Sequence, residues 1–187
     1  MVVKLGEIAT IESGQSAPQD LSFFENGVYP FFRVSDLANK HQSSNLIEVK
    51  DKLNDKGIMG LKLFKKGSIL FPKSGATTFL NHRAIMGCDG YVVSHLAIIS
   101  VNEEKVFSKY IYYYLCHIDA KDLILNDSYP SIRQEELEQI KVYLPDLSTQ
   151  QEIVNQIEQE EKIIEENKKL IEIMENKMQK KIEKLLK

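Results

Sequence analysis

The sequence predicts an α+β protein: a mixed, mostly β domain at residues 1–147, followed by one long helix at residues 148–187 that forms a coiled coil. Two observations support this prediction. Over the first domain, short segments rich in β-branched and aromatic residues alternate with Gly and Pro. After residue 148 there is no Gly or Pro, and apolar residues recur every seven positions.

The composition excludes several classes of protein. Of the 187 residues, 43% are hydrophobic and 27% are charged, which are ordinary proportions for a globular protein. No apolar run approaches the roughly 18 residues of a membrane span, and the first residues lack the apolar core of a secretory signal. Cys88 and Cys116 are too few for a disulfide framework or a four-cysteine zinc site. We therefore expect a cytoplasmic protein with reduced thiols and no membrane segment.

Several segments of the first domain have the residue types of regular structure. Residues 28–32, 68–71 and 95–101 are rich in β-branched or aromatic side chains and predict strands. Residues 84–87 and 91–93 flank Cys-Asp-Gly, which predicts a hairpin because Gly tolerates positive φ. The segment that follows, residues 106–117, predicts a helix, although its tyrosines also suit a strand.

The C-terminal segment predicts a helix of unusual length. Ser148 and Gln151 fit a capping box, in which the Ser hydroxyl accepts a bond from a first-turn N–H and the Gln side chain reaches back. Residues 149–187 would extend about 58 Å as a helix. A helix of that length exceeds what the first domain can cover, so we expect part of it to project.

One face of this predicted helix has the pattern of a coiled coil. Ile157, Ile164, Ile171, Met178 and Leu185 lie seven residues apart and form the first core row of the heptad. The second core row contains the polar residues Glu160, Asn167 and Lys181. Polar breaks in such a core reduce stability but fix register and orientation. A helix that packs only on its own domain is the alternative. The apolar residues expected to form a dimer interface are Ile157, Ile164, Ile171, Met174, Met178 and Leu185.

No motif for catalysis stands out in the sequence. Walker-type phosphate loops, Gly-x-Ser-x-Gly elbows and His-Glu-x-x-His metal motifs are absent. Pro145-Asp146 with Glu160-x-Lys162 matches the loose pattern of metal-dependent nucleases. The Glu and Lys fall within the predicted helix, where side chains two residues apart diverge by about 200°. We interpret this match as chance, and we expect no catalysis, no metal and no cofactor.

The charge distribution instead indicates a binding surface. The stretch from Arg33 to Ala84 contains ten Lys or Arg against four Asp or Glu, although the whole chain has a net charge of −3. Such residues neutralise phosphates, while hydroxyl and amide groups hydrogen-bond base edges. Two solvated loops on an unrelated domain are the alternative. The candidate DNA-binding residues are Arg33, Ser35, Lys40, His41, Lys65, Lys73, Ser74, Thr77, Thr78, Asn81, His82 and Arg83.

Five segments of the chain, taken in order, form a further pattern: residues 5–9, 29–37, 66–77, 131–145 and 147–154. The first reads Leu-Gly-Glu-Ile-Ala, and the last reads Leu-Ser-Thr-Gln-Gln-Glu-Ile-Val. Together the segments resemble the DNA specificity (S) subunits of type I restriction–modification systems, and the last is similar to the start of that family's spacer helix. Ser68 departs from the pattern, because an Asp is common there in the family.

The resemblance implies a half-length S subunit with one target-recognition domain and one spacer helix. It implies a homodimer of antiparallel helices that reads a bipartite, inverted target on double-stranded DNA. It also implies that a methyltransferase (M) subunit docks on the dimer, and it leaves open whether an ATP-dependent restriction (R) subunit joins. The residues alone also allow another class of protein, a coiled-coil protein–protein adaptor with a peptide-binding head.

Overall fold

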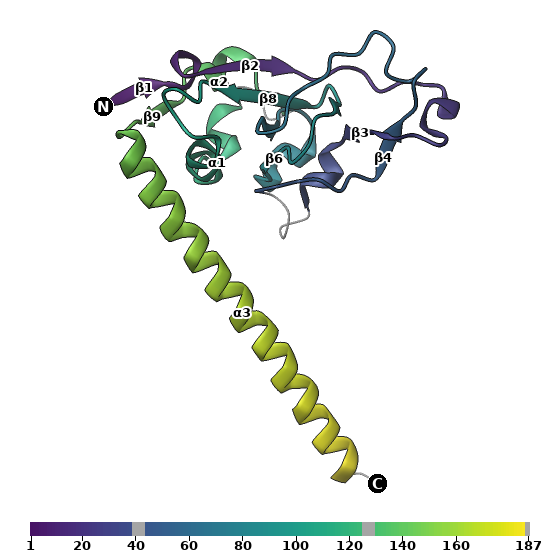
Figure 1. The fold of residues 1–187 in the computed structure, drawn as a ribbon, viewed down its shortest axis with the longest axis vertical. Coiled ribbons are helices and arrows are strands. Elements are labelled where there is room, and N and C mark those ends of the chain that lie inside the picture. The colour runs from purple at the N-terminus through teal and green to yellow at the C-terminus, as the bar shows by residue number, and fades with distance from the viewer. Residues whose placement is uncertain (39–43, 125–129, 186–187) are drawn as a thin grey trace. The chain divides into compact units, whose positions relative to one another are not determined.

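The computed structural model describes residues 1–38, 44–124 and 130–185, and it confirms the predicted α+β class (Figure 1). The chain divides into two compact units, Met1–Gln150 and Gln151–Lys187. The first unit contains every strand that the structure describes, and the second consists of most of the C-terminal helix. Within the described ranges, no helix combines the length and the apolar character that crossing a bilayer requires.

The core of the first unit is built on a four-stranded antiparallel sheet. Its central strand β8 pairs on both sides, so that Ile99 lies opposite Ile11 on one neighbour and Ile69 on the other. All three side chains are buried, which explains the continuous apolar runs in the sequence. The predicted strands at residues 68–71 and 95–101 are confirmed. In spatial order the strands are β2 (Ala9–Ser13), β8 (Leu96–Val101), β5 (Ile69–Pro72) and β6 (Ala84–Ile85).

A second, three-stranded sheet shows that the predicted hairpin is wrong. Strand β3 pairs antiparallel with β4 and parallel with β7, whereas β6 belongs to the four-stranded sheet. The Cys-Asp-Gly segment therefore carries the chain from one sheet to the other. Gly90 is required for close packing, because an added Cβ would lie 2.5 Å from the ring of Phe32. The strands are β4 (Asp51–Leu53), β3 (Tyr29–Phe32) and β7 (Tyr91–Val92).

A two-stranded antiparallel sheet joins the beginning of the chain to the residues that precede the long helix. Strand β1 (Val2–Lys4) pairs with β9 (Lys141–Tyr143), as Figure 1 shows near the N label. Helix α1 (Ser108–Cys116) confirms the predicted helix. Two of its tyrosines attach the helix to β9, because the hydroxyls of Tyr110 and Tyr114 donate to carbonyls of that strand at 2.6 and 2.9 Å.

The remaining short elements complete the first unit. Helix α2 (Gln134–Glu138) precedes β9 and buries Leu137. In the described part of the chain, five 3₁₀ helices connect the strands and helices. They are η1 (Leu5–Glu7), η2 (Leu21–Phe24), η3 (Val34–Ala38), η4 (Ala76–Leu80) and η5 (Ala120–Leu123).

Helix α3 (Leu147–Leu185) confirms the predicted long helix, with 39 residues. Its N-cap is Asp146 and not Ser148, so the predicted capping box is wrong. The Asp146 carboxylate accepts bonds from the N–H and the hydroxyl of Thr149, both at 3.0 Å. These bonds lower the pKa of Asp146. The helix begins earlier than predicted because this carboxylate already satisfies a first-turn N–H.

Gln150 is a fully buried polar residue in the first turns of α3. Its side-chain carbonyl accepts a bond from the N–H of Phe107 at 3.1 Å. Its amide group donates to the carbonyls of Lys105 and Pro145 at 3.2 and 2.9 Å. One side chain thus satisfies three backbone groups, which fixes the start of α3 within the first unit.

Replacing Gln150 with alanine should lower the free energy of unfolding by about 2 kcal/mol, because the N–H of Phe107 and two carbonyls would lose their partner. Urea unfolding followed by circular dichroism measures the change. Gln151→Ala is the matched control, since the Gln151 side chain is exposed and donates to Asn155 one turn along α3. We expect less than about 0.5 kcal/mol for this control. Equal effects of the two substitutions would contradict the assigned role.

Candidate nucleic-acid interface

The predicted DNA-binding residues, apart from Lys65, fall on two segments of the first unit. We call residues 33–43 the arginine segment and residues 73–83 the recognition loop. Lys40 and His41 of the arginine segment lie outside the described residues. The remaining positions can be placed individually.

A tight turn brings the beginnings of the two segments together. The N–H of Val93 donates to the carbonyl of Phe32 at 3.0 Å, directly before the arginine segment. The N–H of Lys73 donates to the carbonyl of His95 at 2.9 Å, where the recognition loop begins. Val93 and His95 are two residues apart, so at most about 7 Å separates their Cα atoms. Two segments that are distant in sequence therefore leave the core at neighbouring points.

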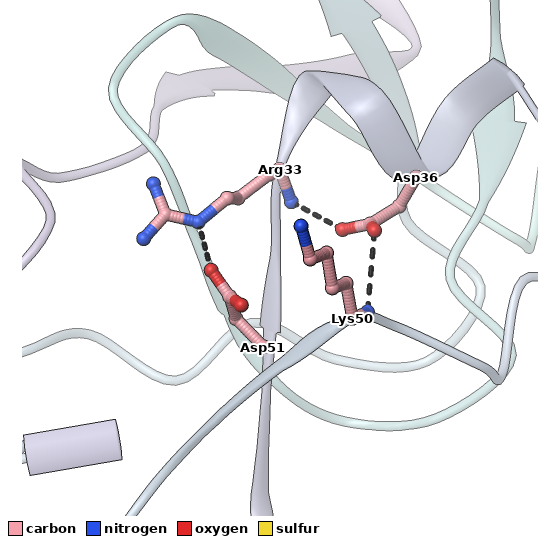
Figure 2. Close-up of polar contacts among 4 residues, drawn as sticks. All are labelled: Arg33, Asp36, Lys50 and Asp51. Atoms are coloured by element: carbon pink, nitrogen blue, oxygen red, sulfur yellow. Dashed lines mark hydrogen bonds and ion pairs between the residues drawn. The ribbon is translucent and has the colours of Figure 1, made fainter.

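The arginine segment is held by two carboxylates (Figure 2). The Nε of Arg33 forms an ion pair with Asp51, and the terminal guanidinium nitrogens point away from that carboxylate. Asp36 accepts bonds from the backbone N–H groups of Arg33 at 2.7 Å and Lys50 at 3.3 Å. Ser35 is exposed on η3. The predicted contact residues Arg33 and Ser35 thus lie at or near the surface, with Arg33 partly neutralised.

The recognition loop is fixed at its beginning by the backbone and by a histidine. The N–H of Gly75 donates to the carbonyl of Pro130 at 2.9 Å, and Gly75 has a φ of +79° that favours glycine. The hydroxyl of Ser74 bonds Nδ1 of His95 at 2.7 Å. Thr77 is half-buried and donates its hydroxyl to the carbonyl of Ser74 at 3.4 Å. The exposed His95 therefore belongs to this surface, although nothing in its local sequence indicates so.

Asn81 fixes the end of η4 against η5. Asn81 has a φ of +52°, a left-handed conformation that asparagine tolerates. Its side-chain carbonyl accepts a bond from the N–H of Ala120 at 2.9 Å, and its amide donates to Asp119 at 3.1 Å. The pKa of Asp119 is lowered, first by the backbone N–H of Lys121 and then by Asn81. The Asn81 amide therefore has a structural function in the loop.

Thr78 and Arg83 are buried, which corrects their prediction as DNA contacts. Arg83 is 2% exposed, and its guanidinium carbon lies 3.5 Å from the centroid of the Phe71 ring. It donates to the carbonyl of His82 at 2.7 Å, and burial lowers its pKa to about 10. Thr78 has no exposed surface. Arg83 turns inward over the Phe71 ring of β5, and Thr78 is fully covered, so neither side chain is presented to solvent in this conformation.

The outward-facing part of the recognition loop has a mixed character. Lys73, Thr77 and His82 are half-exposed and can offer an ammonium, a hydroxyl and an imidazole. Phe79 and Leu80 are 36% and 57% exposed. This apolar pair is absent from the predicted contact residues, because its neighbours in the sequence are polar.

Three lysines form a separate surface beside the four-stranded sheet. Lys62, Lys65 and Lys66 line an open cleft of about 330 Å³. Lys62 is paired with Glu12, and Lys65 is paired with Asp89 at 2.8 Å. These carboxylates come from outside the lysine segment itself. The basic stretch is therefore less positive in the folded protein than its composition suggests, although Lys65 is exposed.

The structure gives the loose nuclease pattern no metal-binding geometry. Glu160 and Lys162 lie two residues apart on α3, where their side chains diverge. Asp146 is engaged as the N-cap of the same helix. Among the described residues, no three His, Cys, Asp or Glu side chains lie close enough to hold a metal ion.

Comparison with known proteins identifies the family. Residues 1–175 match the family described as the type I restriction modification DNA specificity domain. The chain belongs to this family. The MjaIX specificity subunit of a type I restriction enzyme from Methanocaldococcus jannaschii is 30% identical over 151 residues, which cover 77% of this chain and 33% of that protein. The chain thus spans about a third of the length of this curated relative.

Solved structures of specificity subunits share the fold of this family member. The HsdS subunit from Thermoanaerobacter tengcongensis superimposes with a TM-score of 0.65 at 20% identity, over 88% of this chain and 38% of that chain. The S subunit from M. genitalium gives 0.61 at 13% identity, over 92% and 42%. A chain from a structure of a type I R-M system gives 0.70 at 20% identity, over 88% and 38%.

Arg83→Ala should lower the free energy of unfolding by about 2–4 kcal/mol, because it removes the contact with Phe71 and leaves a cavity under the recognition loop. Urea unfolding in the absence of DNA measures the effect. Arg133→Ala, which truncates an exposed arginine, is the control and should change stability by less than about 0.5 kcal/mol. An Arg83→Ala protein of unchanged stability would restore Arg83 as a candidate contact residue.

Proposed function

We propose that this chain is a non-catalytic recognition subunit of a cytoplasmic type I restriction–modification complex, and that its first unit binds double-stranded DNA in a sequence-specific manner. The observation that carries the proposal is membership of the specificity-domain family over residues 1–175. The rigidly anchored recognition loop supports it, because a loop held at both ends can present side chains to base edges in a fixed geometry.

Polar side chains of the first unit supply the contacts in this proposal. Lys65 and Lys73 neutralise phosphates, which contributes affinity without sequence information. The hydroxyls of Ser35 and Thr77 and the imidazole of His82 hydrogen-bond base edges. Thr78 and Arg83 act from inside by holding the loop. Arg33 and Lys65, two of the predicted contact residues, are already paired with Asp51 and Asp89. Binding of DNA by the isolated chain should therefore be weak.

The remaining activities of the complex belong to other subunits in this proposal. A methyltransferase subunit docks on the recognition subunit and supplies the cofactor and the chemistry. An ATP-dependent restriction subunit joins where the system includes one. A second copy of this chain pairs through antiparallel α3 helices, so that two first units read the two halves of an inverted target. The exposed apolar residues of α3 support this pairing.

Lys73→Ala should weaken binding to all DNA sequences and reduce the salt dependence by about one counterion, because one phosphate contact is lost. Binding to a pool of random duplexes, measured at several salt concentrations with the methyltransferase partner present, provides the affinity and the selected motif. Lys180→Ala, the same change on α3, is the control. Binding that does not depend on salt, or a pool without an enriched motif, would favour the peptide-binding adaptor.

Ile164→Asp with Ile171→Asp should convert the dimer to a monomer, because two buried charges would enter the paired helices. Sedimentation velocity of the full chain measures this. Lys162→Asp with Asn176→Asp is the matched control, since both positions lie opposite the apolar row and should leave the dimer intact. A double Ile variant that still sediments as the parent protein would contradict pairing through α3.

A further inference from the structure

The exposed apolar surface of α3 has a defined pattern from Ile163 to Leu185. Between Ile163 and Leu185, its apolar side chains are 49–85% exposed in the single chain. The first core row of the heptad runs from Ile157 to Leu185 at seven-residue intervals. The second core row consists of Glu160, Asn167, Met174 and Lys181. The inference below rests on the proposed pairing of two copies and concerns how they are aligned.

The charged residues of the second core row select the antiparallel orientation. In a parallel pair each core residue faces its own copy, so Glu160 would face Glu160 and Lys181 would face Lys181. Like charges in a partly dehydrated interface repel each other strongly. In an antiparallel pair, residues of the first row face residues of the second row. Glu160 then faces Ile171, and each like-charge contact in the core is removed.

We propose that Glu161 and Lys168 set the register of this antiparallel pair. The register in question places Ile164 of one copy opposite Asn167 of the other. In antiparallel coiled coils, residues that flank the core on the same side meet across the interface. Glu161 then lies beside Lys168 of the second copy, and the two-fold symmetry makes this contact twice. On the other flank Ile163 lies beside Leu170, again twice, so both flanks are complementary.

Neighbouring registers lose this complementarity. A slip of one heptad in one direction places Glu161 beside Glu175 and Lys168 beside Lys168. A slip in the other direction places Glu161 beside Glu161. A slip of two heptads restores an attractive contact between Lys168 and Glu175, but it leaves roughly three to four turns at the start of each helix unpaired. Of these registers, the proposed one combines opposite charges with the greatest overlap of the two helices.

The register matters for recognition because the paired helices determine how far apart the two target halves lie. A slip of one heptad moves one helix along the other by about 10 Å. This displacement corresponds to roughly three base pairs of B-DNA. Glu161 and Lys168 are therefore residues that determine the spacing of the target, although they lie in the helical unit and contact no base.

Charge reversal tests the proposed contact. Glu161→Lys or Lys168→Glu alone should raise the dimer dissociation constant about tenfold at low salt, because two attractive contacts become repulsive. The double variant should return to within about threefold of the parent value. Analytical ultracentrifugation of the full chain measures these constants. Lys162→Glu and Glu183→Lys, which carry the same charge changes on the outward face, are the matched controls. Single variants that behave like these controls, or a double variant that fails to recover, would overturn the proposal.

Disulfide trapping reads the register directly. Both native cysteines, Cys88 and Cys116, are first replaced by serine. Mixing an Ile164→Cys chain with an Asn167→Cys chain should give a cross-linked heterodimer under mild oxidation. Mixing Asn167→Cys with Ile171→Cys, which a one-heptad slip would bring together, should not.

The outcomes distinguish a wrong register from an absence of pairing between the α3 helices. Preferential trapping of the Asn167–Ile171 pair in a protein that still dimerises would overturn the register alone. A parent chain that is monomeric at all concentrations would overturn the pairing of α3 and the register with it. DNA recognition by the first unit would survive either result.

Discussion

The first unit depends on the closure of its chain by strands β1 and β9. The N-terminal ammonium of Met1 donates to the carbonyl of Leu144 at 3.1 Å, and the N–H of Leu144 donates to the carbonyl of Met1 at 2.7 Å. Buried backbone groups need such partners, so the pairing extends to the residue before Pro145. After Pro145, Asp146 is the N-cap of α3, and the buried Gln150 side chain bonds the backbone of Phe107. The long helix therefore starts at a defined point of the first unit.

The recognition loop combines a buried and an exposed function in one short segment. On its interior side Thr78 is buried and Arg83 lies over the Phe71 ring of β5, and Asn81 joins η4 to η5. Because these groups are fixed by packing and hydrogen bonds, the side chains between them are presented without much conformational freedom. A specificity domain requires this arrangement, since base readout depends on geometry as much as on the type of side chain.

The helical unit differs from the first unit, because its backbone is a single helix and its side chains form an apolar row interrupted by polar residues. Helix α3, whose 39 residues include most of this unit, is one uninterrupted helix with exposed Ile, Leu and Met side chains. Such a surface is unfavourable in water unless something covers it. Polar residues in the core rows weaken the pairing but restrict the ways in which it can form. In the proposed function, recognition of bases and measurement of distance belong to different parts of the chain.

The sequence alone determined the features that depend on local pattern: the strands β5 and β8, helix α1, and the long helix with its heptad row. Periodicity and residue type decide these elements because their hydrogen bonds and apolar faces involve near neighbours or long uniform runs. Only the tertiary structure decided that β6 and β7 belong to different sheets, that Asp146 caps α3, and that Arg83 lies inside while His95 lies beside Ser74. These outcomes depend on groups distant in sequence, and an arginine in a basic loop has the same local pattern whether it faces DNA or an aromatic ring.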